Sequence, residues 1–271
     1  MQKRLSLLIL ALFIFQFASA QNGTPSAAGA EGLAMGNTGT AHTGIYSLFS
    51  NPAGLSELEK TSVAVFGEQR FLIADLTILN VGFAMPTKSG NFGLQIQQFG
   101  IDNYTEQKFG LAYARSLSEK FALGAKIDVL NTRIPEYGSQ LVLTFELGIQ
   151  SNLSEKLSVA AHTYSPITVS VGEDYDLPSI LNLALAYKSS EKLWMTLEAE
   201  KDIDHPVAIK AGIAYAATDN FVLRLGGATG PTLFSFGLGY TKKNITIDVA
   251  SMYHQDLGMM PGLSGVFGFG G

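Results

Sequence analysis

The stretch Leu141–Gln150, "LVLTFELGIQ", alternates strictly between two kinds of side chain. This alternation predicts a β-strand with one apolar face and one face of small, polar or charged side chains, because successive side chains of a strand point to opposite sides. One face carries Leu141, Leu143, Phe145, Leu147 and Ile149, and the other carries Val142, Thr144, Glu146, Gly148 and Gln150. The stretches "FALGAKIDVL" from Phe121 and "VAIKAGIAY" from Val207 repeat this pattern. The pattern predicts strands with one apolar face.

Segments of this kind recur from Thr61 to the end of the chain. About fourteen can be counted, each about ten residues long, which is an even number and a length suited to tilted strands that cross a bilayer. Short polar turns such as "TKSGN" from Thr87 alternate with looser connections such as "TVSVGEDYDLP" from Thr168. We therefore expect an all-β fold in which residues 61–271 form an antiparallel transmembrane β-barrel of about fourteen strands.

The amino terminus predicts export. Lys3 and Arg4 precede an apolar run from Leu5 to Phe17, and Ala18-Ser19-Ala20 offers a small-residue cleavage site. These features are typical of a secretory signal peptide over residues 1–20. The chain has no cysteine, so disulfides, thiolate metal sites and a lipid-modified cysteine anchor are excluded.

Composition narrows the class of protein. The chain is 46% hydrophobic but only 15% charged, whereas a soluble domain carries about 25% charged residues. A net charge of -5 argues against a nucleic-acid-binding surface, which is normally basic. Alternation alone would also fit a secreted soluble β-sandwich or propeller. The low charge and the long, regular strands favour the membrane barrel over that alternative.

A weak internal repeat places four tyrosines at equivalent positions. "GLAYARSLSEKF", "LALAYKSSEKL", "GIAYAATDNF" and "GLGYTKKNI" each end a strand with a tyrosine and then cross a polar turn. These are Tyr113, Tyr187, Tyr215 and Tyr240. Tyrosine is favoured where hydrocarbon meets water, so this row is predicted to form the aromatic girdle at one membrane interface.

Charged residues on the face away from lipid form the second set of candidates. They are Lys126, Asp128, Glu146, Lys188, Glu198, Lys210, Arg224 and Asp248. Opposite charges inside a barrel usually pair across strands, so most of them are expected to brace the wall and a minority to meet a substrate.

Competing chemistry finds little support. "MGNTGTAHTG" lacks the lysine and the spacing of a phosphate loop, and the four histidines have no metal-ligand spacing. Ser251 and His254 suggest a membrane-embedded hydrolase, but an offset of three places them on opposite faces of a strand. The sequence therefore predicts no enzyme, no cofactor and no metal site.

The stretch before the first strand carries a family resemblance. "GLAMGNTGTAHTGIYSLFSNPAGLSEL", Gly32 to Leu58, resembles the amino-terminal signature of FadL-type hydrophobic-compound transporters and the related PorV/PorQ-type outer-membrane proteins. The resemblance implies that residues 21–60 form a hatch inside the barrel. Its candidate residues are Gly32, Gly36, Gly39, Gly44, Asn51, Pro52, Ala53 and Gly54. Family members often carry an acidic residue shortly before the Asn-Pro-Ala corner, and here that stretch reads "HTGIYSLFS".

The resemblance also implies location and role. We expect a protein of the outer membrane of a Gram-negative bacterium, in contact with outer-membrane lipid, that passes hydrophobic small molecules past the hatch. The alternative is an accessory barrel of a type IX-like secretion system, which binds exported proteins or partner subunits. We further expect Gly32–Leu55 to lie extended inside the barrel, entering from the periplasm, with Asn51 and Pro52 against the inner wall near the periplasmic rim.

Overall fold

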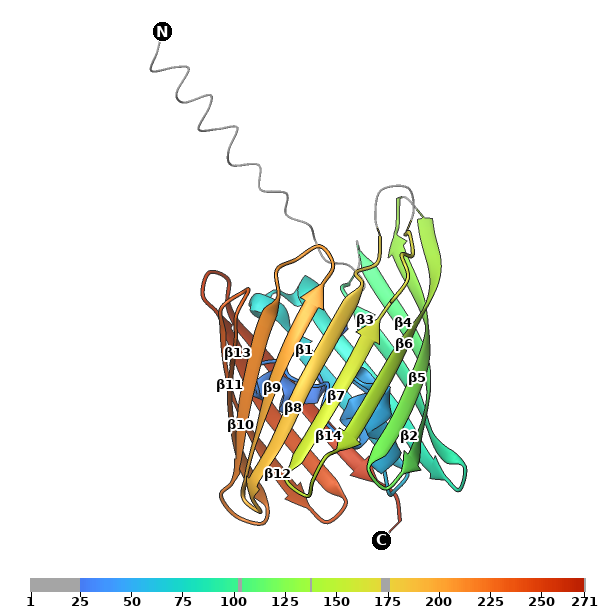
Figure 1. The fold of residues 1–271 in the computed structure, drawn as a ribbon. Coiled ribbons are helices and arrows are strands. Elements are labelled where there is room, and N and C mark those ends of the chain that lie inside the picture. The colour runs from blue at the N-terminus through green and yellow to red at the C-terminus, as the bar shows by residue number, and fades with distance from the viewer. Residues whose placement is uncertain (1–24, 102–103, 137, 172–175, 271) are drawn as a thin grey trace.

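The computed structural model describes residues 25–101, 104–136, 138–171 and 176–270. The expected signal peptide and residues 21–24 lie outside the described residues. Within the described ranges, fourteen antiparallel strands form one closed barrel, in which each strand pairs with its neighbours along the chain and β1 pairs with β14 (Figure 1). The all-β, fourteen-stranded barrel predicted from the alternation is therefore confirmed. The strands are β1 (Ser62–Gln69), β2 (Thr77–Thr87), β3 (Gly90–Phe99), β4 (Thr105–Ser118), β5 (Phe121–Ile134), β6 (Gly138–Asn152), β7 (Leu157–Tyr164), β8 (Ile180–Ser190), β9 (Leu193–Asp202), β10 (Ala208–Ala216), β11 (Phe221–Ala228), β12 (Leu233–Lys242), β13 (Ile245–His254) and β14 (Gly258–Gly268).

The two rims of the barrel differ. The connections after even-numbered strands are mostly tight turns, and these, with the carboxyl end, form the lower rim in Figure 1. The connections after odd-numbered strands include the longer loops and form the upper rim. We call these the short-turn rim and the long-loop rim.

The outer surface of the barrel is apolar. On β6, Leu141, Leu143, Leu147 and Ile149 are exposed, whereas Val142, Thr144, Glu146 and Gly148 face the interior and are buried. The same alternation continues on other strands, and it leaves large apolar side chains exposed around the wall. An apolar band of this kind is what lipid-facing barrel walls present. None of the helices in the described ranges is long and apolar enough to cross a membrane.

Residues 25–60 lie inside the barrel, and we call them the lumen segment (Figure 1). The segment contains the α-helix α2 (Gly29–Ala34) and the 3-10 helices η1 (Ile45–Phe49) and η2 (Pro52–Glu57). The short helices differ from the extended segment that was predicted here. Helical turns satisfy backbone donors locally, which a segment without a strand partner otherwise could not do.

The direction of the lumen segment also differs from the expected one. Pro25 and Ser26 line a cavity together with Arg70, His205 and Pro231, which belong to connections at the long-loop rim. The segment then descends, and Glu57 accepts a hydrogen bond from Asn152 beside the β6–β7 turn (Nδ2–Oε1 3.1 Å). The described chain thus begins at the rim opposite Ser62. Spacing along the sequence fixes where the segment ends but not which way it runs through the barrel.

Candidate functional site

The lumen segment rests on glycines of the wall. A Cβ on Gly148 would collide with Asn51, and a Cβ on Gly124 would collide with Ala53. A Cβ on Gly212 would lie 2.5 Å from Met35 Cβ. Glycine is the residue that lets two backbones approach this closely. The barrel wall is therefore shaped to receive this particular segment.

The Asn51-Pro52 corner is one anchor. Asn51 is fully buried, and its Nδ2 donates to Thr40 O (2.7 Å) and Ile149 O (3.3 Å). Its Oδ1 accepts from Ala53 N (3.1 Å), which caps η2 with Pro52 in the first turn. One side chain therefore joins the corner to another part of the segment and to the wall near the short-turn rim.

Apolar packing holds one side of the lumen segment. Leu33, Ile45, Leu48, Phe49 and Leu55 are buried in one core with wall residues of β1, β2, β4, β13 and β14. Among those wall residues are Ala64, Phe66, Ala84, Ala112, Ala114, Ala250, Met252 and Met260. The lumen on this side is filled with side chains rather than open.

Polar contacts hold the lumen segment against β9 and β12. Glu198 Oε2 accepts hydrogen bonds from the backbone amides of Gly39 (3.0 Å) and Thr40 (2.9 Å). Ser235 Oγ donates to Ala34 O and accepts from Gly36 N, each at 2.8 Å. These side chains bind backbone groups that the irregular part of the segment leaves without a partner in a helix.

A tyrosine of the segment reaches the wall as well. The Tyr46 hydroxyl lies 3.1 Å from Asp248 Oδ2 and 2.7 Å from Ser264 Oγ. The hydroxyl therefore joins η1 to strands β13 and β14.

Seven of the eight predicted lumen charges are buried, and they form three groups. Lys126 Nζ lies 2.7 Å from Glu146 Oε1 and 3.8 Å from Asp128 Oδ1. Lys210 Nζ lies 3.5 Å from Glu198 Oε1, and Arg224 NH1 lies 2.8 Å from Asp248 Oδ1. Lys188 differs: its side chain is exposed at the short-turn rim and pairs with Glu191 of the turn. Its position in the alternation faces inward, but the strand has by then reached the rim.

The four predicted girdle tyrosines have outward positions near the short-turn rim. Tyr113, Tyr187 and Tyr215 are exposed, and Tyr240 is half-buried. Phenylalanines accompany two of them, with ring centroids 5.0 Å apart for Phe92–Tyr113 and 4.8 Å apart for Phe221–Tyr240.

The predicted hatch residues are mostly buried in the lumen segment. Gly32, Gly36, Gly39, Asn51, Pro52, Ala53 and Gly54 are buried, whereas Gly44 is half-buried. Gly36 needs its positive φ of 75°, and a Cβ there would lie 2.5 Å from Gly227 O.

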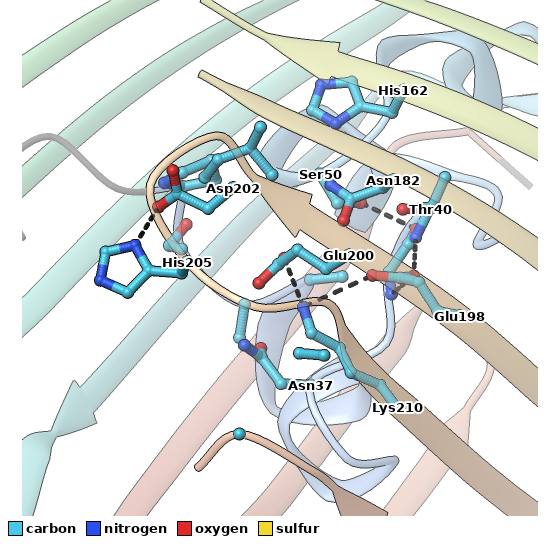
Figure 2. A pocket seen from close by; sticks show the side chains of 18 of the residues that line it. Asn37, Thr40, Ser50, His162, Asn182, Glu198, Glu200, Asp202, His205 and Lys210 are labelled. Carbon is cyan, nitrogen blue, oxygen red and sulfur yellow. Dashed lines mark hydrogen bonds and ion pairs between the residues drawn. The ribbon is translucent and has the colours of Figure 1, made fainter. Parts of the chain in front are cut away.

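A polar cavity of about 350 Å³ lies between the lumen segment and strands β8 to β10, toward the long-loop rim. Figure 2 shows its labelled side chains, with Lys210 between Glu198 and Glu200 and with His205 beside Asp202. We call it the outer cavity. Its lining is more polar than apolar.

A second cavity of about 390 Å³ lies at the short-turn rim. It is lined by Glu155, Lys156, Ser158, Ala186, Tyr187, Lys188, Glu191 and Trp194. We call it the inner cavity. Ser158, Ala186 and Thr196 are partners on β7, β8 and β9, and Ala160, Ala184 and Glu198 are partners one step nearer the outer cavity.

One layer of contacts separates the two cavities along β7 to β9. Ala41 of the lumen segment packs against Ala160 and Ala184 of the wall. Beside it, the Thr38 hydroxyl lies 3.0 Å from that of Thr196. Glu198 accepts hydrogen bonds from the backbone amides of Gly39 and Thr40. We call these contacts the barrier layer.

Hydrolytic and metal chemistry find no support in the geometry. Ser251 occupies an outward position on β13, whereas His254 Nδ1 accepts amide hydrogen bonds from Asp256 (3.1 Å) and Leu257 (3.2 Å) in the following turn. Within the described residues, no group of three or more acidic or histidine side chains could hold a metal ion.

Several residues of the lumen were not predicted. His162 Nε2 lies 2.8 Å from Glu146 Oε2, and Glu31 of the lumen segment lies 3.4 Å from Arg224 NH2. Asn182 and Asp202 line the outer cavity. Their inward positions follow from the alternation, but nothing in the local sequence indicates the cavity itself.

The comparisons with known proteins give a shared fold. No family model matches the chain, and no curated protein matches it. Among solved structures, the Ralstonia pickettii toluene transporter TbuX is 14% identical, with a TM-score of 0.71, 90% of this chain covered and 97% of that chain. The CymD monoaromatic hydrocarbon channel is 13% identical, with a TM-score of 0.72 and coverages of 93% and 100%.

A Pseudomonas aeruginosa FadL homologue is also similar, with 13% identity, a TM-score of 0.64 and coverages of 91% and 99%. These identities are low, so the likeness concerns the path of the chain and not the chemistry of its residues. The protein therefore shares the fold of these three structures.

Proposed function

We propose that this protein is an outer-membrane barrel that passes small hydrophobic molecules, and that its lumen segment is the hatch. In this proposal residues 21–60 form the hatch and residues 61–271 form the barrel. The barrier layer is the observation that carries the proposal: cavities at the two rims are separated by the packing of Ala41 on Ala160 and Ala184.

The fold and the outer surface support the same role. Channels whose names state toluene or monoaromatic hydrocarbons as their cargo share the fold. The band of exposed apolar side chains matches a wall that faces lipid, and the four tyrosines would then lie at the periplasmic interface.

A reversible lock tests the hatch. Because the chain lacks cysteine, Ala41→Cys with Ala160→Cys would introduce a disulfide across the barrier layer and nowhere else. Uptake of toluene by cells that make this variant should be low under oxidising conditions and should recover after reduction. The single variant Ala41→Cys is the matched control. Equal uptake in the locked and reduced states would overturn the proposal.

One observation favours a second role, that of an accessory barrel of a secretion system. Both cavities carry charged side chains, among them Glu200 and Lys210 in the outer cavity and Lys156 and Lys188 in the inner cavity. Charged linings suit hydrocarbons poorly. Affinity purification from native membranes separates the two roles, since a stoichiometric protein partner supports the accessory role and a barrel with co-purified hydrophobe supports passage.

A further inference from the structure

The outer cavity is a site in which carboxylates outnumber the lysine and arginine side chains. Three carboxylates line it, those of Glu198, Glu200 and Asp202. Lys210 is the ammonium among them, and its Nζ lies 2.6 Å from Glu200 Oε2 and 3.5 Å from Glu198 Oε1. Arg70 also borders the cavity, and its Nε lies 3.5 Å from Glu68 Oε1. Asp202 has a neighbour of its own in the lining, since its Oδ2 lies 3.1 Å from His205 Nδ1.

A buried acceptor faces the same cavity. Asn182 is 6% exposed, lies on β8 and is one of the residues that line the cavity (Figure 2). Its Oδ1 has no hydrogen-bond partner within the described residues. A buried acceptor without a donor is destabilising, so a ligand that brings a donor recovers free energy there.

We infer that the outer cavity binds a small protonated amine, which donates to Asn182 Oδ1 and to the carboxylates of Glu200 and Asp202. The excess of carboxylates disfavours an anion, and the polar lining disfavours a hydrocarbon. A volume of about 350 Å³ holds a molecule of a few carbon atoms. This site is independent of the passage of hydrophobic molecules, because binding to it requires neither the barrier layer to open nor a hydrophobic cargo.

Three probes of matched length test the class of ligand. The purified full-length barrel in detergent is titrated calorimetrically with cadaverine, with pentanediol and with glutarate. Cadaverine should bind at least about tenfold more tightly than the diol, because hydrogen bonds to charged groups are stronger than those between neutral groups. Glutarate should not bind. Equal affinity for amine and diol, or preference for glutarate, would overturn the inference.

Variants locate the ligand. Asn182→Leu and Glu200→Gln should each weaken cadaverine binding, whereas Glu136→Gln removes an exposed carboxylate in the β5–β6 connection and should leave it unchanged. Lys210→Met removes the resident ammonium, so cadaverine should bind more tightly and should raise the Tm of this variant more than that of the parent. Weaker binding of cadaverine by Lys210→Met would overturn the inference. Binding equally unaffected by Asn182→Leu and Glu200→Gln would place the amine elsewhere.

Discussion

Asn51 Oδ1 occupies the place that a Cβ on Gly148 would need, so a residue of the lumen segment and a residue of the wall interlock without a side chain between them. The two residues are far apart in the sequence, but together they fix the position of the segment on the wall, and we call this contact the seat. Asn51 Nδ2 also donates to Ile149 O, the next residue of the wall, at 3.3 Å.

The first prediction follows from this seat. Gly148→Ala should displace the Asn51 corner and destabilise the seated segment by about 1–3 kcal/mol, as overpacking usually does. Limited proteolysis should then cut the chain within residues 25–60 faster than in the parent. Gly265→Ala is the matched control, because a Cβ there would meet Val65 at an ordinary 3.7 Å. Equal cleavage of both variants would contradict the seat.

The second prediction concerns the corner itself. The double variant Asn51→Ala with Pro52→Gly loses three hydrogen bonds of the Asn51 side chain and the fixed φ of Pro52. Single-channel conductance in planar bilayers should rise, while the barrel stays assembled and heat-modifiable on gels. Asn51→Asp keeps the acceptor for Ala53 N and should have a smaller effect. Unchanged conductance in the double variant would refute the anchoring role of the corner.

The third prediction concerns the barrier layer. Glu198→Leu removes the acceptor for the amides of Gly39 and Thr40, so residues 38–41 should leave the wall more often. Liposomes that contain this variant should swell faster in small sugars than those with the parent protein. Glu198→Gln retains one acceptor oxygen and should lie between the two. Swelling rates that do not follow this order would show that Glu198 does not restrain the segment.

The fourth prediction tests which surface meets lipid. Leu197 is exposed on the outer face of β9, between Leu185 and Ala211 of its neighbours. Leu197→Arg should lower the free energy of unfolding in lipid vesicles by about 2–4 kcal/mol, because arginine at the bilayer midplane is costly. Leu181→Arg, beside Lys201 at the long-loop rim, should cost about 1 kcal/mol or less. Denaturant titration measures both, and equal costs would argue against a membrane band at this height.

The sequence by itself determined the number of strands in the barrel wall and which of their residues face the interior. Period-two alternation is a local property of each strand, so stretches such as 141–150 predicted which side chains face the interior, and the number of such stretches predicted fourteen strands. The inward positions of Lys126, Asp128 and Glu146 follow from the same rule.

The tertiary structure alone decided how the interior is filled. Pairing of Lys126 with Glu146 depends on strand register, and the exposure of Lys188 depends on where β8 reaches the rim. The direction of the lumen segment, its short helices and its hold on Glu198 depend on contacts between residues that lie far apart in the chain. Such contacts are set by the closure of the barrel and by the positions of its wall glycines, which no local pattern of the sequence encodes.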